Sequence, residues 1–306
     1  MPKEKIIFLV GPTASGKSAA VVHLAKKIKG EIISCDSMQV YKGMNILTSK
    51  PPAALRKAVK HYLISAVSPE AEYNVSDYRK EALKKISQIQ HKRKIPIFVG
   101  GTGLYMSVLI NGIFAESRTD KAIRKRLGAQ LEKFGSKYLH RKLEKVDPQA
   151  AAKIHPNDAK RIIRALEVFE ATGKPISLLQ QQRSGLDQDY EIKVFCLNLA
   201  RQKLYQRIEQ RIDRMLAQGL VREVKKLLKL KLSRTAQFAI GIKELKGYLD
   251  GEYDLEKAVE IMKLNTRHYA KRQLTWFRKE KRIQWINLKG KEKPQEVAEK
   301  IWRKLY

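Results

Sequence analysis

The chain has 306 residues, with 63 Lys and Arg against 31 Asp and Glu, so its formal net charge is +32 at pH 7. This exceeds what solubility requires and favours a polyanionic partner, with nucleic acid the first candidate, an anionic membrane surface the second and a merely basic cytosolic protein the third. The first apolar stretch is too short for a secretion signal and no window approaches 18 apolar residues, so we expect a cytoplasmic protein without membrane spans.

The chain contains two cysteines, Cys35 and Cys196, which lie far apart in segments predicted to be strands. Thiols of cytosolic proteins stay reduced, and buried ones act as small packing residues. Their spacing matches no zinc motif. We therefore expect two reduced core residues.

The first predicted element is an apolar strand that ends at Val10 and runs into the sequence GPTASGKS at residues 11–18. The pattern Gly-x-x-x-x-Gly-Lys-Ser is typical of a loop whose backbone N–H groups bind phosphate, followed by a helix that starts near Lys17. Lys17 would reach the terminal phosphates and Ser18 would ligate Mg²⁺. The motif does not identify the molecule that carries the phosphates.

The next two predicted strands, residues 31–35 and 95–99, each deliver polar or small residues at their carboxyl ends. Asp36 follows the first, and Gly100, Gly101 and Thr102 follow the second. Open α/β sheets bind ligands at this edge, so Asp36 is a candidate metal ligand or general base; its alternative role is to cap the turn that begins there. Thr102 can donate or accept a hydrogen bond beside a close backbone approach.

Charged, helix-forming sequence replaces the strand pattern between about residues 114 and 189. A further apolar strand follows at residues 192–199, then long helices at 203–232 and 255–281 and a short amphipathic helix after Gly290. The alternation predicts an α/β fold, a P-loop NTPase-like parallel sheet core with helices on both faces, interrupted by an inserted all-helical subdomain. We assign residues 1–114 and 190–306 to the core and 115–189 to the insertion.

Basic residues on the last long helix, Arg267, Lys271 and Arg278, share one face beside Trp276 and Phe277. This stripe is either a phosphate-backbone contact surface or a solvated face over core aromatics. In the insertion, Asp158 is expected to cap the helix that carries Arg161 and Arg164.

Six blocks of the chain together resemble the tRNA dimethylallyltransferase family, also called tRNA isopentenyltransferases, of the bacterial type. The resemblance covers essentially the whole chain. The blocks are GPTASGKS (11–18), DSMQVYKGM (36–44), GGTGLY (100–105), HPNDAKRIIRALEV (155–168), ATGKPIS (171–177) and RIEQRIDRM (207–215).

The resemblance implies transfer of a dimethylallyl group from dimethylallyl diphosphate to the exocyclic amine of the tRNA adenosine 3′ of the anticodon. The opening loop would then hold an isoprenoid diphosphate and not ATP. The family expectation is a monomer that uses Mg²⁺, with the insertion contacting the anticodon stem-loop of tRNA.

The resemblance also implies roles for individual residues. Asp36 would be the general base, with Thr102 and Lys17 beside it in catalysis. The diphosphate would bind Gly11, Pro12, Thr13, Ala14, Ser15, Gly16, Lys17, Ser18 and Arg211, with Ser18 on Mg²⁺. The tRNA would contact Asp36, Ser37, Met38, Gln39, Thr102, Arg124, Lys160, Arg161, Ile162, Ile163, Arg164, Gly241, Lys243, Lys271 and Arg278. Ile242 stands where the family has a Tyr, which removes the stacking side chain expected there.

Three rival functions share parts of this pattern. A P-loop kinase or NTPase fits the first block best, but the blocks at Asp36 and Thr102 argue against it. A non-catalytic RNA-binding protein fits the charge, yet it needs no diphosphate loop facing an acidic strand end. The adenylate isopentenyltransferases modify a free nucleotide, which needs no basic helical insertion.

Overall fold

The computed structural model describes residues 3–114 and 120–306 and divides into two compact units. One unit comprises residues 1–109 and 189–306, and the other residues 110–188. The domain boundary predicted at residue 115 falls outside the described residues. Across the two described ranges, no helix is both long and apolar enough to cross a membrane.

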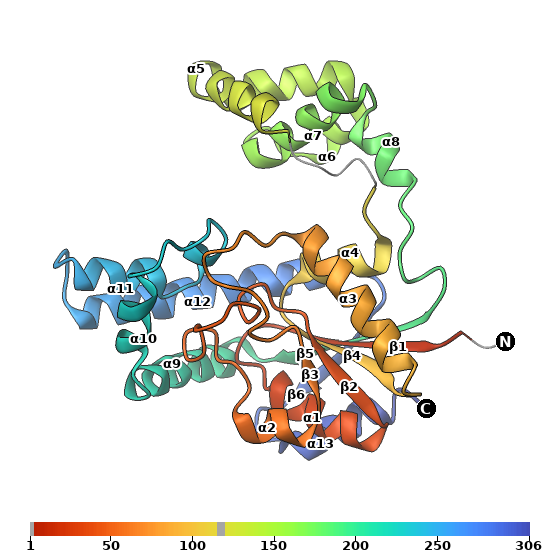
Figure 1. Ribbon diagram of the computed structural model, residues 1–306, viewed down its shortest axis with the longest axis vertical. Helices are drawn as coiled ribbons and strands as arrows, with labels where there is room; N and C mark the ends of the chain where they lie inside the picture. The colour runs from red at the N-terminus through yellow and green to blue at the C-terminus, as the bar shows by residue number, and fades with distance from the viewer. Residues whose placement is uncertain (1–2, 115–119) are drawn as a thin grey trace. The chain divides into compact units, whose positions relative to one another are not determined.

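The first unit is built on a six-stranded sheet in which all neighbouring strands run parallel, in the order β3-β2-β4-β1-β5-β6 (Figure 1). The strands are β1 (Lys5–Val10), β2 (Gly30–Ser34), β3 (His61–Tyr62), β4 (Ile95–Gly100), β5 (Glu191–Leu199) and β6 (Ile283–Leu288). This confirms the predicted α/β class.

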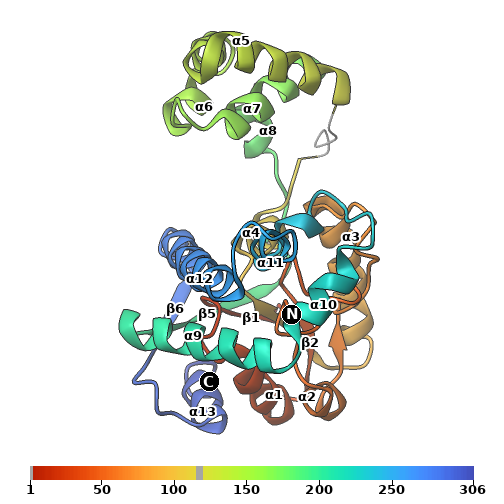
Figure 2. The ribbon, with the colours of Figure 1, turned by 90° about the vertical axis from the view of Figure 1, so that its left-hand side faces the viewer.

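Helices cover both faces of the sheet, with α1, α2 and α13 on one side and α3, α4 and α12 on the other (Figure 1, Figure 2). The helices that begin in this unit are α1 (Lys17–Lys27), α2 (Ala53–Ala58), α3 (Val75–Gln90), α4 (Gly103–Asn111), α9 (Arg201–Ala217), α10 (Leu220–Leu227), α11 (Ile242–Leu249), α12 (Leu255–Phe277) and α13 (Pro294–Trp302), with a 3-10 turn, η1 (Ala236–Phe238). Because both faces are covered, the strands β1, β2 and β4 are buried along almost their whole length, and β1 and β4 are almost continuously apolar.

The strand register brings three carboxyl ends to one edge of the sheet. Val10 pairs with both Gly100 and Cys196, and Ser34 pairs with Val99. The segments that leave β1, β2 and β4 therefore start side by side, which is where parallel sheets place their ligand sites.

The helix predicted over residues 203–232 is in fact two helices, α9 and α10. Gly219 separates them with a left-handed backbone, φ 94°. Such a conformation suits glycine and ends the first helix. The helix predicted over 255–281 ends at Phe277, and β3 and β6 were not predicted at all. Cys35 lies just past β2, while Cys196 lies within β5; both are buried free thiols, as expected.

The second unit contains helices and no strand among its described residues, as predicted for the insertion. Its helices are α5 (Lys121–Val146), α6 (Pro148–Lys153), α7 (Ala159–Thr172) and α8 (Ile176–Gln181). Gly135 bends α5 with a left-handed φ of 77°. The unit has its own hydrophobic core, which includes Leu139, Leu143, Ile162 and Leu179.

At Gly100, the end of β4 passes close to the backbone that follows β2. A Cβ at this position would lie 1.9 Å from the carbonyl oxygen of Cys35. We expect Gly100→Ala to destabilise the protein by about 1–3 kcal/mol, the usual cost of overpacking, and to lower its melting temperature in circular dichroism. Gly128→Ala is the control, because nothing lies within 4 Å of a Cβ there. Equal melting of Gly100→Ala and the wild type would contradict this account of the strand ends.

Candidate functional site

Residues 11–16 form a loop between β1 and α1, and Lys17 and Ser18 begin the helix. Gly11 (φ 144°), Ala14 (φ 63°) and Gly16 (φ 93°) all adopt positive φ. Such a backbone suits glycine, and at Ala14 it is strained, a feature that clusters at ligand-binding sites. Gly16 caps α1 without a side-chain hydrogen bond. The first-turn N–H groups therefore remain available for an anion.

Lys17 folds back into this loop. Its Nζ donates to the carbonyl oxygens of Gly11 (2.9 Å) and Pro12 (2.7 Å) and lies 3.3 Å from Ser15 Oγ. The side chain is buried, and burial lowers the pKa of the ammonium to about 8, partly opposed by the negative charge of Asp36. A buried cation beside open N–H groups makes the loop a strong anion site.

Asp36 follows β2 and both shapes a turn and faces the pocket. Its Oδ1 accepts from the backbone N–H groups of Met38 (2.9 Å) and Gln39 (3.3 Å). The capping role considered from the sequence is therefore present. It occupies one carboxylate oxygen, so it does not exclude a chemical role for the other.

Thr102 connects the end of β4 to the segment that carries Asp36. Its Oγ1 accepts from the backbone N–H of Ser37 at 3.0 Å, and its own N–H donates to the carbonyl oxygen of Cys35 at 3.2 Å. Thr102 thus holds the residues on both sides of Asp36 in place.

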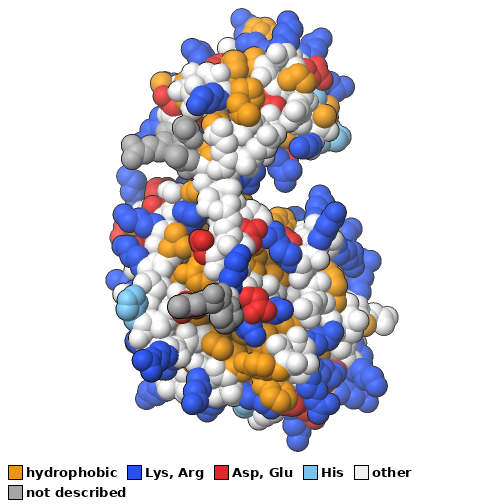
Figure 3. All heavy atoms as spheres, turned by 90° about the vertical axis from the view of Figure 1, so that its right-hand side faces the viewer, with side chains coloured by type: hydrophobic (Ala, Val, Ile, Leu, Met, Phe, Trp, Pro, Cys, Tyr) orange, Lys and Arg blue, Asp and Glu red, His pale blue; other side chains and the backbone are white. Residues whose placement is uncertain are grey.

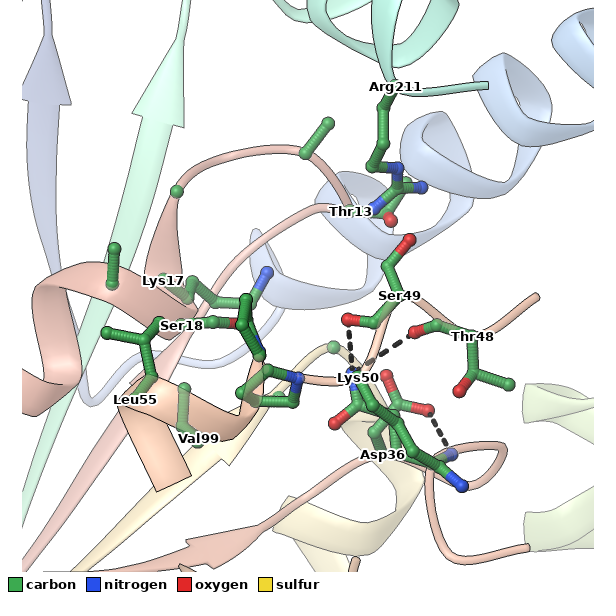
Figure 4. Close-up of a pocket in the computed structure, with 18 of the residues that line it drawn as sticks. Thr13, Lys17, Ser18, Asp36, Thr48, Ser49, Lys50, Leu55, Val99 and Arg211 are labelled. Carbon is green, nitrogen blue, oxygen red and sulfur yellow. Dashed lines mark hydrogen bonds between the residues drawn. The ribbon is translucent and has the colours of Figure 1, made fainter. Parts of the chain in front are cut away.

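Arg211, from α9, enters the same pocket (Figure 4). Burial lowers the pKa of its guanidinium to about 10, while Asp36 opposes the change. Within the described structure, its Nε is buried without a hydrogen-bond partner. A buried donor of this kind favours an incoming acceptor such as a phosphate oxygen.

Arg207 and Arg214 also line the pocket, at positions four before and three after Arg211 on the same face of α9. Arg207 donates to the carbonyl oxygen of Gly290 at 2.9 Å. Neither was singled out from the sequence, although the i, i+4, i+7 spacing was a signal that could have found them.

The pocket has a volume of about 950 Å³ and spans the anion loop, the Asp36 segment and the face of α9. Its remaining walls come from residues 45–53 and from Tyr269 and Gln273 of α12. It is large enough for more than a diphosphate, since small-molecule sites run from about 300 to 1,000 Å³.

Two charged residues that were not singled out from the sequence fix the part of the pocket wall that residues 45–50 form. Glu223 of α10 accepts from the backbone N–H groups of Asn45, Ile46 and Leu47 at 2.9–3.0 Å. Lys50 donates to Ser65 Oγ at 2.8 Å, and burial lowers its pKa to about 8. Glu223 is 176–178 residues from its partners, and Lys50 is 15 residues from Ser65, so no short sequence motif predicts either contact.

Several predicted contact residues of the first unit lie away from the pocket. Gly241 caps α11, and Ile242 is only 3% exposed, so it is a core residue that presents no side chain for stacking. Lys243 is exposed. Lys271 and Arg278 are also exposed; Lys271 lies two residues from both Tyr269 and Gln273 and therefore points to the opposite side of α12. Arg267 is paired with Glu209, at 2.5 Å.

In the second unit, a fully buried carboxylate organises two of the predicted arginines. Glu167 Oε2 lies 2.8 Å from nitrogens of both Arg124 and Arg164, and Oε1 accepts from the backbone N–H of Asp120 at 2.9 Å. Such a buried acid requires paired cations. The i, i+3 spacing of Arg164 and Glu167 was a signal for this pair, whereas nothing in the sequence indicated the contacts of Glu167 with Arg124 and Asp120.

The other predicted tRNA-contact residues on α7 include both exposed and buried side chains. Asp158 caps the helix as predicted, accepting from the N–H of Arg161, and both Lys160 and Arg161 are exposed. Ile162 is fully buried in the core of the unit, so its side chain is not on the surface. Ile163 packs against the same core.

Lys and Arg side chains are spread over the surface in Figure 3, in agreement with the charge of the chain.

A family model described as IPP transferase matches residues 39–280. The tRNA dimethylallyltransferase of Carboxydothermus hydrogenoformans is 48% identical over 97% of this chain and 96% of its own length, and that of Geobacter metallireducens is 45% identical over 94% of each.

Solved structures agree with these sequence relatives. The full-length tRNA isopentenylpyrophosphate transferase of Bacillus halodurans is similar with a TM-score of 0.72 and 40% identity, covering 99% of this chain and 97% of that one. A eukaryotic dimethylallyltransferase acting on tRNA is similar with a TM-score of 0.80 and 32% identity, covering 93% of this chain and 74% of that one.

The lowered pKa of Lys17 predicts how anion binding depends on pH. Inorganic diphosphate is a suitable probe in titration calorimetry. We expect its affinity to fall as pH rises through about 8, because the ammonium then loses the proton that attracts the anion. Lys17→Met should weaken diphosphate binding about 10-fold or more at pH 7. In this variant the affinity should no longer fall as pH rises through about 8.

Lys50→Met is the matched control, because its ammonium has a similarly lowered pKa and lines the same pocket. The pH-dependent fall should persist in this variant. Persistence of the full fall in Lys17→Met, and its loss in Lys50→Met, would assign the effect to Lys50 instead.

Proposed function

The chain belongs to the IPP transferase family, and on this premise we propose that it transfers a dimethylallyl group from dimethylallyl diphosphate to the exocyclic amine of the tRNA adenosine 3′ of the anticodon. It is an enzyme, since its relatives are tRNA dimethylallyltransferases over nearly its whole length. The observation that carries the proposal is a single pocket that joins the loop after β1 to the carboxylate of Asp36, which follows β2 at the same edge of the sheet.

The loop at residues 11–18 is proposed to hold the diphosphate. The N–H groups at the start of α1, the Lys17 ammonium and the Arg211 guanidinium all favour negative charge, whatever group the phosphates carry. Lys17 already bonds carbonyl oxygens that a phosphate oxygen could replace. Arg211 contributes a buried donor with unused hydrogen-bonding capacity.

The adenine amine is proposed to approach from the side of Asp36 and Thr102. An adenine in a stacked anticodon loop must be flipped out to reach a carboxylate that lines a pocket. Ser37, Met38 and Gln39 lie on the same segment as Asp36 and would line its entry. The pocket volume of about 950 Å³ leaves room for a base beside the isoprenoid diphosphate.

The reaction is a substitution at the allylic carbon. The amine nitrogen forms a bond to this carbon while the carbon–oxygen bond to diphosphate breaks, and the amine proton passes to the carboxylate of Asp36. An exocyclic adenine amine is a poor nucleophile, so removal of its proton has to accompany bond formation. Lys17, Arg211 and the loop N–H groups stabilise the charge that develops on the leaving diphosphate.

The residues present fit a Mg²⁺ ion that is held mainly by the substrate. Across the described ranges, no group of three His, Cys, Asp or Glu could hold a metal. Ser18 lines the pocket and offers a hard oxygen donor of the kind that Mg²⁺ prefers. Ser18 would hold the ion, which would supply further neutralisation of the leaving group.

Basic residues outside the pocket are proposed to contact tRNA phosphates. In the second unit these are Lys160, Arg161 and the arginines held by Glu167, and in the first unit Lys243, Lys271 and Arg278. Because tRNA is the proposed substrate, we place the enzyme in the cytoplasm, and we propose that a single chain acts as a monomer.

The proposal is tested by incubating the protein with an unmodified tRNA transcript, dimethylallyl diphosphate and Mg²⁺, followed by nuclease digestion and mass spectrometry. One dimethylallyl group should appear on the adenosine 3′ of the anticodon. A transcript with guanosine at that position is the negative control. Phosphate transfer from ATP in a parallel reaction, without prenylation, would support the kinase alternative.

Asp36→Asn tests the general base. The amide oxygen can still accept from Met38 and Gln39, so the turn should survive, while the basic group is lost. We expect kcat to fall about 10²- to 10⁴-fold, with tRNA affinity retained in a filter-binding assay. Turnover equal to that of the wild type would remove Asp36 from the mechanism.

A further inference from the structure

Gln273 of α12 connects the anion loop to the turn after β4. Its Oε1 accepts from the backbone N–H of Thr13 at 2.8 Å, and its Nε2 donates to the carbonyl oxygen of Gly101 at 2.9 Å. The side chain is 6% exposed. One buried amide thus joins two segments that are 88 residues apart. The amide itself lies 172 residues after Gly101 in the chain.

The orientation of this amide is determined by its partners. Thr13 offers an N–H, which requires the amide oxygen, and Gly101 offers a carbonyl, which requires the amide nitrogen. Neither an acid nor an apolar side chain satisfies both groups.

The contact is also sterically tight. A Cβ at Gly101 would lie 2.0 Å from Gln273 Nε2, and a Cβ at Gly103 would lie 2.3 Å from the ring of Trp276, three residues further along α12. Helix α12 therefore rests directly on the glycine turn after β4. Displacement of α12 or of the amide would move the turn that carries Thr102.

The two segments joined by Gln273 hold the two reactants of the proposed reaction, on which this inference rests. Thr13 belongs to the loop proposed to hold diphosphate. Gly101 precedes Thr102, whose hydroxyl fixes Ser37 and so the position of Asp36. The amide therefore lies on a hydrogen-bonded route from the loop after β1 to the segment that carries Asp36.

We propose that Gln273 is a positioning residue, which sets the spacing between the allylic diphosphate and the amine-activating carboxylate. Substitution requires reacting atoms about 3–3.5 Å apart, and a misplacement of about 1 Å can cost about 100-fold in rate. Both polar groups of Gln273 bond the backbone of the two segments, so we assign it no direct contact with the reacting atoms. It acts through Thr13 and Gly101, so its loss should reduce kcat more than the affinity for either substrate.

The test uses Gln273→Met, which is similar in length and apolar, and Gln273→Asn, which keeps an amide too short to join both segments. The control is Gln206→Met, at an exposed position of α9 outside the pocket. Steady-state transfer is measured with dimethylallyl diphosphate and tRNA varied separately, and folding is followed by thermal melting.

We expect kcat to fall about 10- to 100-fold in both Gln273 variants, with both KM values changed far less and with melting that still shows a folded protein. Gln206→Met should match the wild type. Unchanged kcat in a Gln273 variant, a rise in KM that accounts for the whole loss, or unfolding of both variants would overturn the positioning role. Absence of transfer by the wild type would instead contradict the proposed function.

Discussion

The shared edge of three parallel strands is the constraint on which the rest of the site depends. Because β1, β2 and β4 end in register, the anion loop, Asp36 and Thr102 leave the sheet side by side. The backbone of Gly100 lies so close to Cys35 that no side chain fits there. These strands are buried on both faces, so their positions are rigid, and a rigid sheet is what precise alignment of two reactants requires.

Positively charged side chains outnumber negatively charged ones among the residues that line the pocket. Lys17, Lys50 and Arg211 are cations whose pKa values burial lowers, and Asp36 is the acid that partly opposes this change for Lys17 and Arg211. Holding buried cations near one another costs free energy, which an anionic ligand would offset. The arrangement supports the proposal that the substrate carries a diphosphate leaving group.

Contacts between distant residues complete the site. Gln273 connects the loop of β1 to the turn of β4, and Glu223 fixes the wall at residues 45–47. In the second unit, Glu167 has a comparable structural role, because its buried carboxylate holds Arg124 and Arg164 in defined positions. In each case, a polar side chain that makes at least two hydrogen bonds or ion pairs restricts the geometry of groups proposed to meet substrate.

The sequence by itself determined the α/β class, the helical character of the insertion and the local elements of the site, namely the loop at residues 11–18, Asp36 and Thr102. These depend on short-range patterns: apolar runs, glycines where the backbone turns, and polar residues at strand ends. Only the tertiary structure decided where α9 ends, that Ile162 and Ile242 are core residues, that Gln273, Glu223 and Lys50 fix the walls of the pocket, and that Glu167 holds two arginines within the second unit. Their partners are mostly tens to hundreds of residues away, and a contact made by chain folding leaves no periodicity or motif in the sequence around it.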